Sequence, residues 1–105
     1  TAVRRAYWLP GVGLALSLPA LVLAQVEVPD CVSVRGEARW AAMGYNHVVV
    51  VQNGCASRAR CEVSTNVNPE VVRLEVPARE TREVVTFLES PASEFSPRVR
   101  CELAR

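Results

Sequence analysis

Apolar and polar residues alternate through much of the chain after residue 24. The clearest case is 61–67, where odd positions carry cysteine, valine or threonine and even positions carry glutamate, serine or asparagine. A period of two is typical of a β-strand with one buried face. The same period recurs at 71–76 and 98–103. We therefore predict three strands of this kind in the second half of the chain.

The middle of the chain carries four consecutive valines, Val48–Val51. Branching at Cβ suits a pleated strand better than a helical turn. Because both faces of such a strand are apolar, it should be central and covered on both sides. Asn53-Gly54 is a turn signal. Residues 45–66 are therefore predicted to form a hairpin, made of the valine strand, a turn that contains Cys55, and the strand that begins at Cys61.

The remaining segments are less regular. Residues 25–34 alternate but are broken at Pro29-Asp30, which predicts an edge strand in two halves. Residues 35–44 have helix-friendly composition and end at a glycine, so we expect a short helical turn or loop with Trp40 packed inward. Residues 82–89 are apolar on both faces and predict another buried strand. Residues 90–97 contain two prolines and predict a loop, with Phe95 as a plug beneath it.

About six strands separated by turn signals predict an all-β fold, a small antiparallel β-sandwich. In architecture it resembles the immunoglobulin-like and fibronectin-like sandwiches. The Cys–Trp–Cys order of true immunoglobulin domains is missing, because Trp40 precedes Cys55.

Residues 1–24 have the three parts of a secretory signal peptide. Arg4-Arg5 precedes an apolar run, and the run ends in the small residue Ala24. Cleavage before Gln25 would leave 25–105 as one disulfide-stapled domain, exported to a bacterial periplasm or the extracellular space. The alternative is an uncleaved membrane anchor. The two arginines also fit a loose twin-arginine pattern, so the export route stays open.

Four cysteines in an exported domain of this size predict two disulfide bonds. Cys61 and Cys101 both lie in phase with inward valines, whereas Cys31 follows a chain break and Cys55 lies in a turn. We therefore favour Cys61–Cys101 across the core, with Cys31–Cys55 at the edge. The other pairing, Cys55–Cys61 with Cys31–Cys101, remains open. A metal site is not expected, because five residues separate even the closest cysteines.

Charge gives little direction to the choice of partner. The net charge is +1, and residues 1–24 carry two of the 12 basic residues and none of the 11 acidic ones, so the remainder carries −1. No long-range field favours nucleic acid or, after signal cleavage, a membrane. The arginines Arg58, Arg60, Arg98 and Arg100 form one group. We expect Glu62 and Glu102, which lie beside them, to neutralise their charge.

The chain shows no catalytic pattern. It has one histidine and neither a nucleophile elbow nor a phosphate-binding glycine loop, so we expect no enzyme and no cofactor. Aromatic rings beside amide groups do suit a sugar-binding face. The candidate ligand contacts are Trp40, Tyr45, Asn46 and His47. The competing interpretation is that the two rings are core or cap residues and that His47 is a surface histidine.

Three functions fit these features. The first is a secreted or periplasmic, non-enzymatic β-sandwich that acts as a binding or structural module for an unknown protein or glycan. The second is a small secreted enzyme inhibitor that presents residues 90–97 or 54–60. The third is a carbohydrate-binding module that uses Trp40 and Tyr45.

Overall fold

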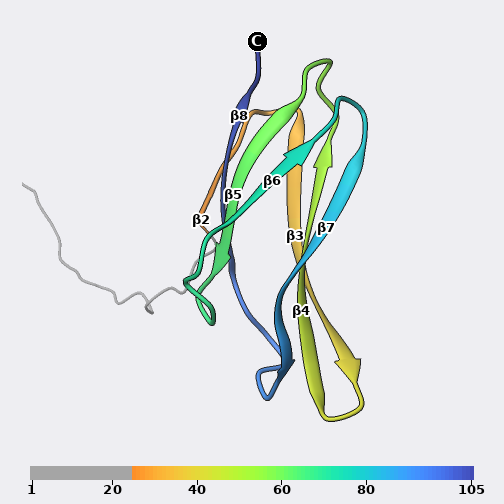
Figure 1. Ribbon diagram of the computed structural model, residues 1–105, viewed down its shortest axis with the longest axis vertical. Coiled ribbons are helices and arrows are strands. Elements are labelled where there is room, and N and C mark those ends of the chain that lie inside the picture. The colour runs from red at the N-terminus through yellow and green to blue at the C-terminus, as the bar shows by residue number, and fades with distance from the viewer. Residues whose placement is uncertain (1–24) are drawn as a thin grey trace, which may run out of the picture.

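A computed structural model describes residues 25–105, which form seven strands in two facing sheets (Figure 1). The predictions of a signal peptide and its cleavage concern residues 1–24 and lie outside this range. The strands are β2 (Gln25–Glu27), β3 (Val32–Ala41), β4 (Gly44–Asn53), β5 (Ala59–Thr65), β6 (Val72–Val76), β7 (Thr81–Ser90) and β8 (Pro97–Leu103).

One sheet has four strands in the order β2-β8-β5-β6, and the other has three in the order β3-β4-β7. β2 runs parallel to β8, and the other pairs are antiparallel. The all-β prediction is confirmed. The break at Pro29-Asp30 divides two strands in different sheets, each at an edge, where we had expected one strand in two halves. Proline suits this position because it lacks the N–H that a continuing ladder would need.

The prediction of a helical turn at 35–44 is wrong. β3 continues to Ala41 and pairs with β4 in unbroken register, with Ala42 and Met43 as the two-residue turn. Helix propensity amounts to a few tenths of a kcal/mol per residue, which is too little to outweigh a full ladder of backbone hydrogen bonds. Trp40 consequently lies on a strand and is 68% exposed, not packed inward.

The predicted hairpin at 45–66 is also wrong, although both of its strands exist. β4 pairs with β3 and β7, whereas β5 pairs with β6 and β8, so residues 54–58 cross from one sheet to the other. The side chain of Asn53 directs this crossing. Its oxygen accepts a hydrogen bond from the Cys55 N–H, and its NH₂ group donates to the carbonyl oxygens of Ser57, Val76 and Pro77.

The core lies between the sheets and consists largely of valine. Val49 and Val51 of β4 face Val63, Val76 and Val99 of the other sheet. β4 is central and buried on both faces, as predicted. β7 is a sheet edge, and the prediction that both of its faces are buried is wrong. Its exposed apolar side chains are Val85, Phe87 and Leu88.

Both favoured disulfides, Cys61–Cys101 and Cys31–Cys55, are present. We expected the Cys61–Cys101 bond to cross the core between the sheets. Instead, the two cysteines lie directly opposite each other on neighbouring strands of one sheet, with Cα atoms 4.1 Å apart. Cys31–Cys55 joins the β2–β3 connection to the crossing after β4. Two disulfides indicate an oxidising, extracytoplasmic setting. Residues 25–105 contain no helix long and apolar enough to cross a membrane.

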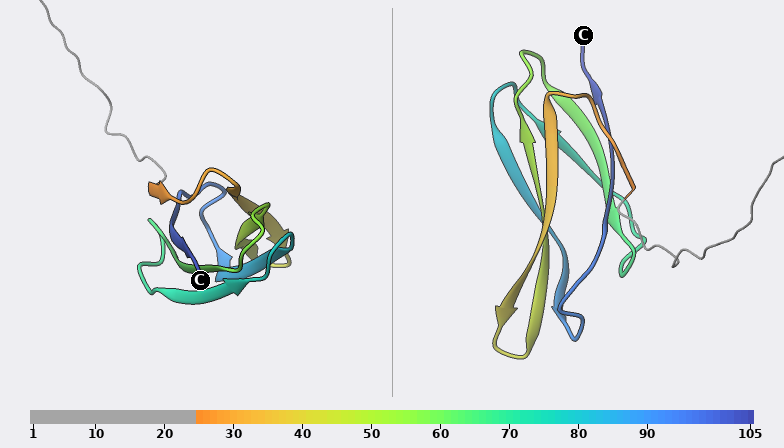
Figure 2. Two further views of the ribbon diagram at one scale, coloured as in Figure 1. Left: turned by 90° about the horizontal axis from the view of Figure 1, so that it is seen from above. Right: turned by 180° about the vertical axis from the view of Figure 1, so that it is seen from behind.

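One end of the molecule is built mainly by the three-stranded sheet. The β3–β4 hairpin reaches past the four-stranded sheet, and the segment between β7 and β8 lies at the same end (Figures 1 and 2). We call this region the distal end and define it as residues 38–46 together with the loop 91–96. It contains three of the four candidate ligand contacts, Trp40, Tyr45 and Asn46, and His47 is the next residue of β4.

Candidate functional site

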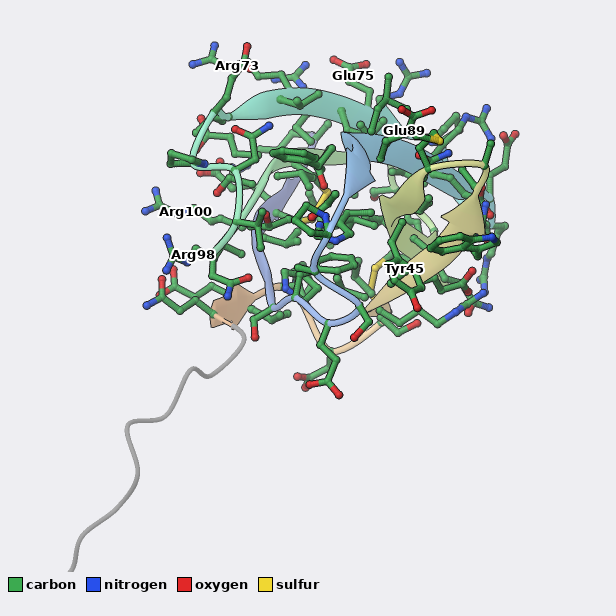
Figure 3. All side chains as sticks on the ribbon, turned by 90° about the horizontal axis from the view of Figure 1, so that it is seen from below. Tyr45, Arg73, Glu75, Glu89, Arg98 and Arg100 are labelled. Carbon is green, nitrogen blue, oxygen red and sulfur yellow. A yellow bond between two sulfur atoms is a disulfide. The ribbon has the colours of Figure 1, made fainter. Side chains whose placement is uncertain are left out.

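Trp40 and Tyr45 come together at the distal end. They are opposite each other in the β3–β4 register, and their ring centroids lie 5.1 Å apart in an edge-to-face arrangement. Tyr45 is half-buried and Trp40 is mostly exposed. Figure 3 looks onto this end and shows Tyr45 beside the hairpin. Two of the four predicted ligand contacts therefore share a surface.

His47 is not available to a ligand, and it is not a surface histidine either. Its side chain is fully buried on the inner face of β4, where the ring stacks on Phe95 with centroids 4.3 Å apart. Nε2 lies 2.7 Å from the carbonyl oxygen of Ala92, which can only accept, so Nε2 carries the proton and donates. His47 therefore ties the loop 91–96 to the sheet. Its Nδ1 is buried with no partner among residues 25–105.

Asn46 lies on the opposite face of β4 from Tyr45 and His47. Its side-chain oxygen accepts a hydrogen bond from the backbone N–H of Glu89 at 3.0 Å. Glu89 has a φ of 54°, in a β-bulge where two residues of β7 oppose Asn46. Asn46 thus supports an irregular backbone, and the four predicted residues do not form one ligand face.

The loop 91–96 is ordered and tied down at several points. Ser90 Oγ accepts from the Ala92 N–H, and Asn66 exchanges hydrogen bonds with the backbone of Ser96. Phe95 packs against the core, which confirms its prediction as a plug. Ser93 and Glu94 at the crest of the loop remain exposed.

A shallow concavity of about 290 Å³ lies between β3 and this loop; its lining residues are Gly36, Ala38, Ser93, Glu94 and Phe95. Glycine is needed at position 36 because a Cβ there would come within 2.9 Å of the Phe95 ring. Sequence reasoning missed this feature. Read with a period of two, positions 36, 38 and 40 share one face, but the same residues were read as helix formers.

The other face of the three-stranded sheet carries a charged network. Arg39 on β3 reaches across β4 to Glu83 on β7 at 3.0 Å and also contacts Glu37, which pairs with Arg35. The aliphatic parts of these side chains therefore lie over the outward valines of β4, and the charged ends reach water. The valine strand was predicted to be covered on both faces. The core covers its inner face, and this charged network covers its outer face.

The carboxylates of the network titrate at lower pH than free glutamates. Hydrogen bonds from Arg35 and then Arg39 lower the pKa of Glu37, and hydrogen bonds from Arg39 lower the pKa of Glu83. The hydrogen bonds that Arg39 donates to Glu83 and Glu37 raise the pKa of Arg39. A carboxylate with a lowered folded-state pKa adds stability above its unfolded-state pKa, and that stability is lost as pH falls through the folded-state value.

Replacing Arg39 with glutamine should therefore lower the melting temperature at pH 7, and this effect should become smaller as the pH falls into the range where the carboxyl groups take up protons. The unfolded carboxyl groups have a pKa of about 4.3, so the difference from wild type should shrink below that pH. Thermal unfolding followed by circular dichroism at several pH values measures it. Arg98→Gln is the matched control, because Arg98 forms no ion pair among residues 25–105. A difference that is constant with pH would contradict this account.

The arginines of the four-stranded sheet point outward, as Figure 3 shows for Arg73, Arg98 and Arg100. Three of the four arginines in the predicted group are paired, but none of them pairs with the expected Glu62 or Glu102. Arg58 and Arg60 both contact Glu75, and Arg100 contacts Glu27. Glu62 contacts Arg73, a residue outside the predicted group. With charges of both signs interspersed, this face has little preference for an anionic or a cationic partner.

Among residues 25–105, no three side chains of the metal-ligating types come together. The distal end presents two aromatic rings, a small concavity and an exposed loop. Comparison with protein-family models, curated protein sequences and solved structures found no match for the chain.

Proposed function

We propose that the chain is an exported, non-enzymatic binding module whose contact surface is the distal end. The main support for this proposal is the exposure of large apolar side chains at the hairpin tip, where Trp40 is 68% and Met43 79% exposed. Tryptophan is usually highly buried and is enriched at the centres of binding interfaces. A three-stranded sheet facing a four-stranded one supports an immunoglobulin- or fibronectin-like sandwich, whose ends commonly carry binding loops.

The backbone contacts of the tip support this proposal because they hold the rings in place before any ligand arrives. The β3–β4 register is unbroken up to the turn, and Tyr45 braces Trp40. Gly44 lies so close to β7 that a Cβ there would come within 2.7 Å of the Glu89 backbone. A surface that is already ordered loses less conformational entropy on binding.

Co-sedimentation with cell-surface material from the source organism tests the proposal. We expect wild-type protein to bind saturably and Trp40→Ala to weaken binding by about tenfold or more, since interface tryptophans commonly contribute more than 1.4 kcal/mol. Val85→Ala is the matched control, because Val85 is 49% exposed and lies on β7 opposite Val48, outside the distal end. Equal binding by wild type and Trp40→Ala would refute the distal end as the contact surface.

A further inference from the structure

We infer that the ligand of the distal end is a neutral pyranose oligosaccharide that lies along β3, with one sugar on Trp40 and the next in the concavity beneath the loop 91–96. This inference rests on the proposed function and names the ligand class of the same site. It combines the open indole face, the position of the concavity and the charges that line it.

The ring of Trp40 has a free face. In an edge-to-face pair with Tyr45, at most one face of the indole is occupied, and the side chain is 68% exposed. A flat apolar ring of this kind covers the C–H face of a pyranose while the sugar hydroxyls stay in water. The contact requires an uncovered ring held at a fixed angle, and Tyr45 supplies that support.

The concavity continues the same face of β3. Positions 36, 38 and 40 alternate to one side of the strand, and about 6.6 Å separates Ala38 from Trp40 along it. Gly36 and Ala38 keep the floor low, and Ser93 and Glu94 of the loop line the wall. A second sugar beside the one on Trp40 would therefore meet a shallow floor and two hydrogen-bonding groups.

Charge narrows the ligand class. Glu94 is the one charged residue that lines the concavity, and its carboxylate has no ion-pair partner among residues 25–105. Arg39, although next to Trp40, lies on the opposite face of the sheet, in the charged network. A carboxylate can accept hydrogen bonds from sugar hydroxyls but repels uronates and sulfated sugars. Anionic glycans are therefore disfavoured.

The lining also favours a sugar over a peptide. An apolar peptide anchor needs a deep, desolvated pocket, and the concavity is shallow, with exposed polar groups on its wall. Its two exposed polar side chains suit hydroxyl-rich ligands better than apolar ones. A protein partner is the competing ligand class, and the experiments below distinguish it from a sugar.

The test uses the full chain carrying Trp8→Phe, so that Trp40 is the sole tryptophan. Neutral hexasaccharides of glucose, N-acetylglucosamine, mannose or galactose are titrated while tryptophan fluorescence is recorded, with hexagalacturonate as the anionic probe. We expect a saturable fluorescence shift with at least one neutral hexasaccharide and none with hexagalacturonate. Calorimetry should show about tenfold weaker binding for Glu94→Gln, and no binding for Trp40→Ala. Glu70→Gln, a second exposed loop glutamate, should bind as wild type does.

The outcomes separate this inference from the proposed function. If no neutral hexasaccharide binds at millimolar concentration, or if hexagalacturonate binds equally well, the glycan inference is overturned. If co-sedimentation is lost in Trp40→Ala and on protease treatment of the cell-surface material, yet survives periodate oxidation of its sugars, the partner is a protein. In that case the proposed function stands and the glycan inference fails.

Discussion

Asn53→Asp is expected to lose about 3–5 kcal/mol of unfolding free energy, a large part of the 5–15 kcal/mol typical of a domain. Asn53 is 1% exposed, and its NH₂ group donates to three backbone carbonyl oxygens. Aspartate has nearly the same shape but places an acceptor-only, charged group against those three acceptors. The change therefore removes both N–H donors and adds a buried charge, for which the Cys55 N–H is the one hydrogen-bond donor that Asn53 already had.

Urea unfolding of wild type and Asn53→Asp measures the loss. Gln52→Glu is the matched control, because it makes the same amide-to-acid change on the neighbouring, exposed residue. We expect the control to stay within about 0.5 kcal/mol of wild type, as surface substitutions usually do. A loss below about 1 kcal/mol in Asn53→Asp would mean that water or a shifted backbone satisfies the three carbonyl oxygens.

The second large effect is expected from removal of the Cys61–Cys101 disulfide by a double alanine substitution. The two cysteines are 40 residues apart in sequence, for which the chain-entropy model gives about 4 kcal/mol. β5 and β8 are already paired by backbone hydrogen bonds at this point, so the bond adds little constraint to the folded state. The disulfide should therefore stabilise the protein mainly by restricting the conformations of the unfolded chain.

Two readouts of urea unfolding check this origin. The unfolding free energy should fall by about 4 kcal/mol, and the m-value should rise because the freed unfolded chain exposes more surface. Replacing Cys31 and Cys55 by alanine is the control pair, with a smaller expected loss of about 3.5 kcal/mol because 24 residues separate them. An unchanged m-value with a loss near 1 kcal/mol would contradict an unfolded-state origin.

The sequence predicted the features that depend on local pattern. Alternation located β5, β6 and β8, and the phase of Cys61 and Cys101 with inward valines predicted their pairing. The four valines predicted a strand buried on both sides, which β4 is. These predictions hold because side-chain period and Cβ branching act within a few residues of the chain.

The errors concern choices that the local pattern does not decide. Asn53-Gly54 is compatible with a hairpin turn and with a crossing between sheets, and the choice depends on Val76 and Pro77, far along the chain. Residues 35–41 have helix-friendly composition but complete a ladder with β4. The apolar residues of β7 looked buried, yet whether a strand lies at a sheet edge depends on the topology of the whole domain.

The candidate site was predicted in part for the same reason. Trp40 and Tyr45 were singled out together and do meet, because both lie near a tight turn. His47 was grouped with them by proximity in sequence, but in a strand it points to the same side as the core residue Val49. Ser93 and Glu94 lie more than fifty residues after Trp40 in the sequence, and no local pattern links them to it.

The bulges of β7 have a consequence for how the molecule behaves at high concentration. An exposed edge strand with apolar side chains is a template on which another chain can add and start aggregation. Here Thr86 and the Leu88–Glu89 pair interrupt the register opposite β4. The side-chain NH₂ group of Asn68 also donates a hydrogen bond to the carbonyl oxygen of Thr86. An incoming strand would find regular pairing groups only along Thr81–Val85. The irregular stretch therefore protects the most apolar part of this edge against self-association.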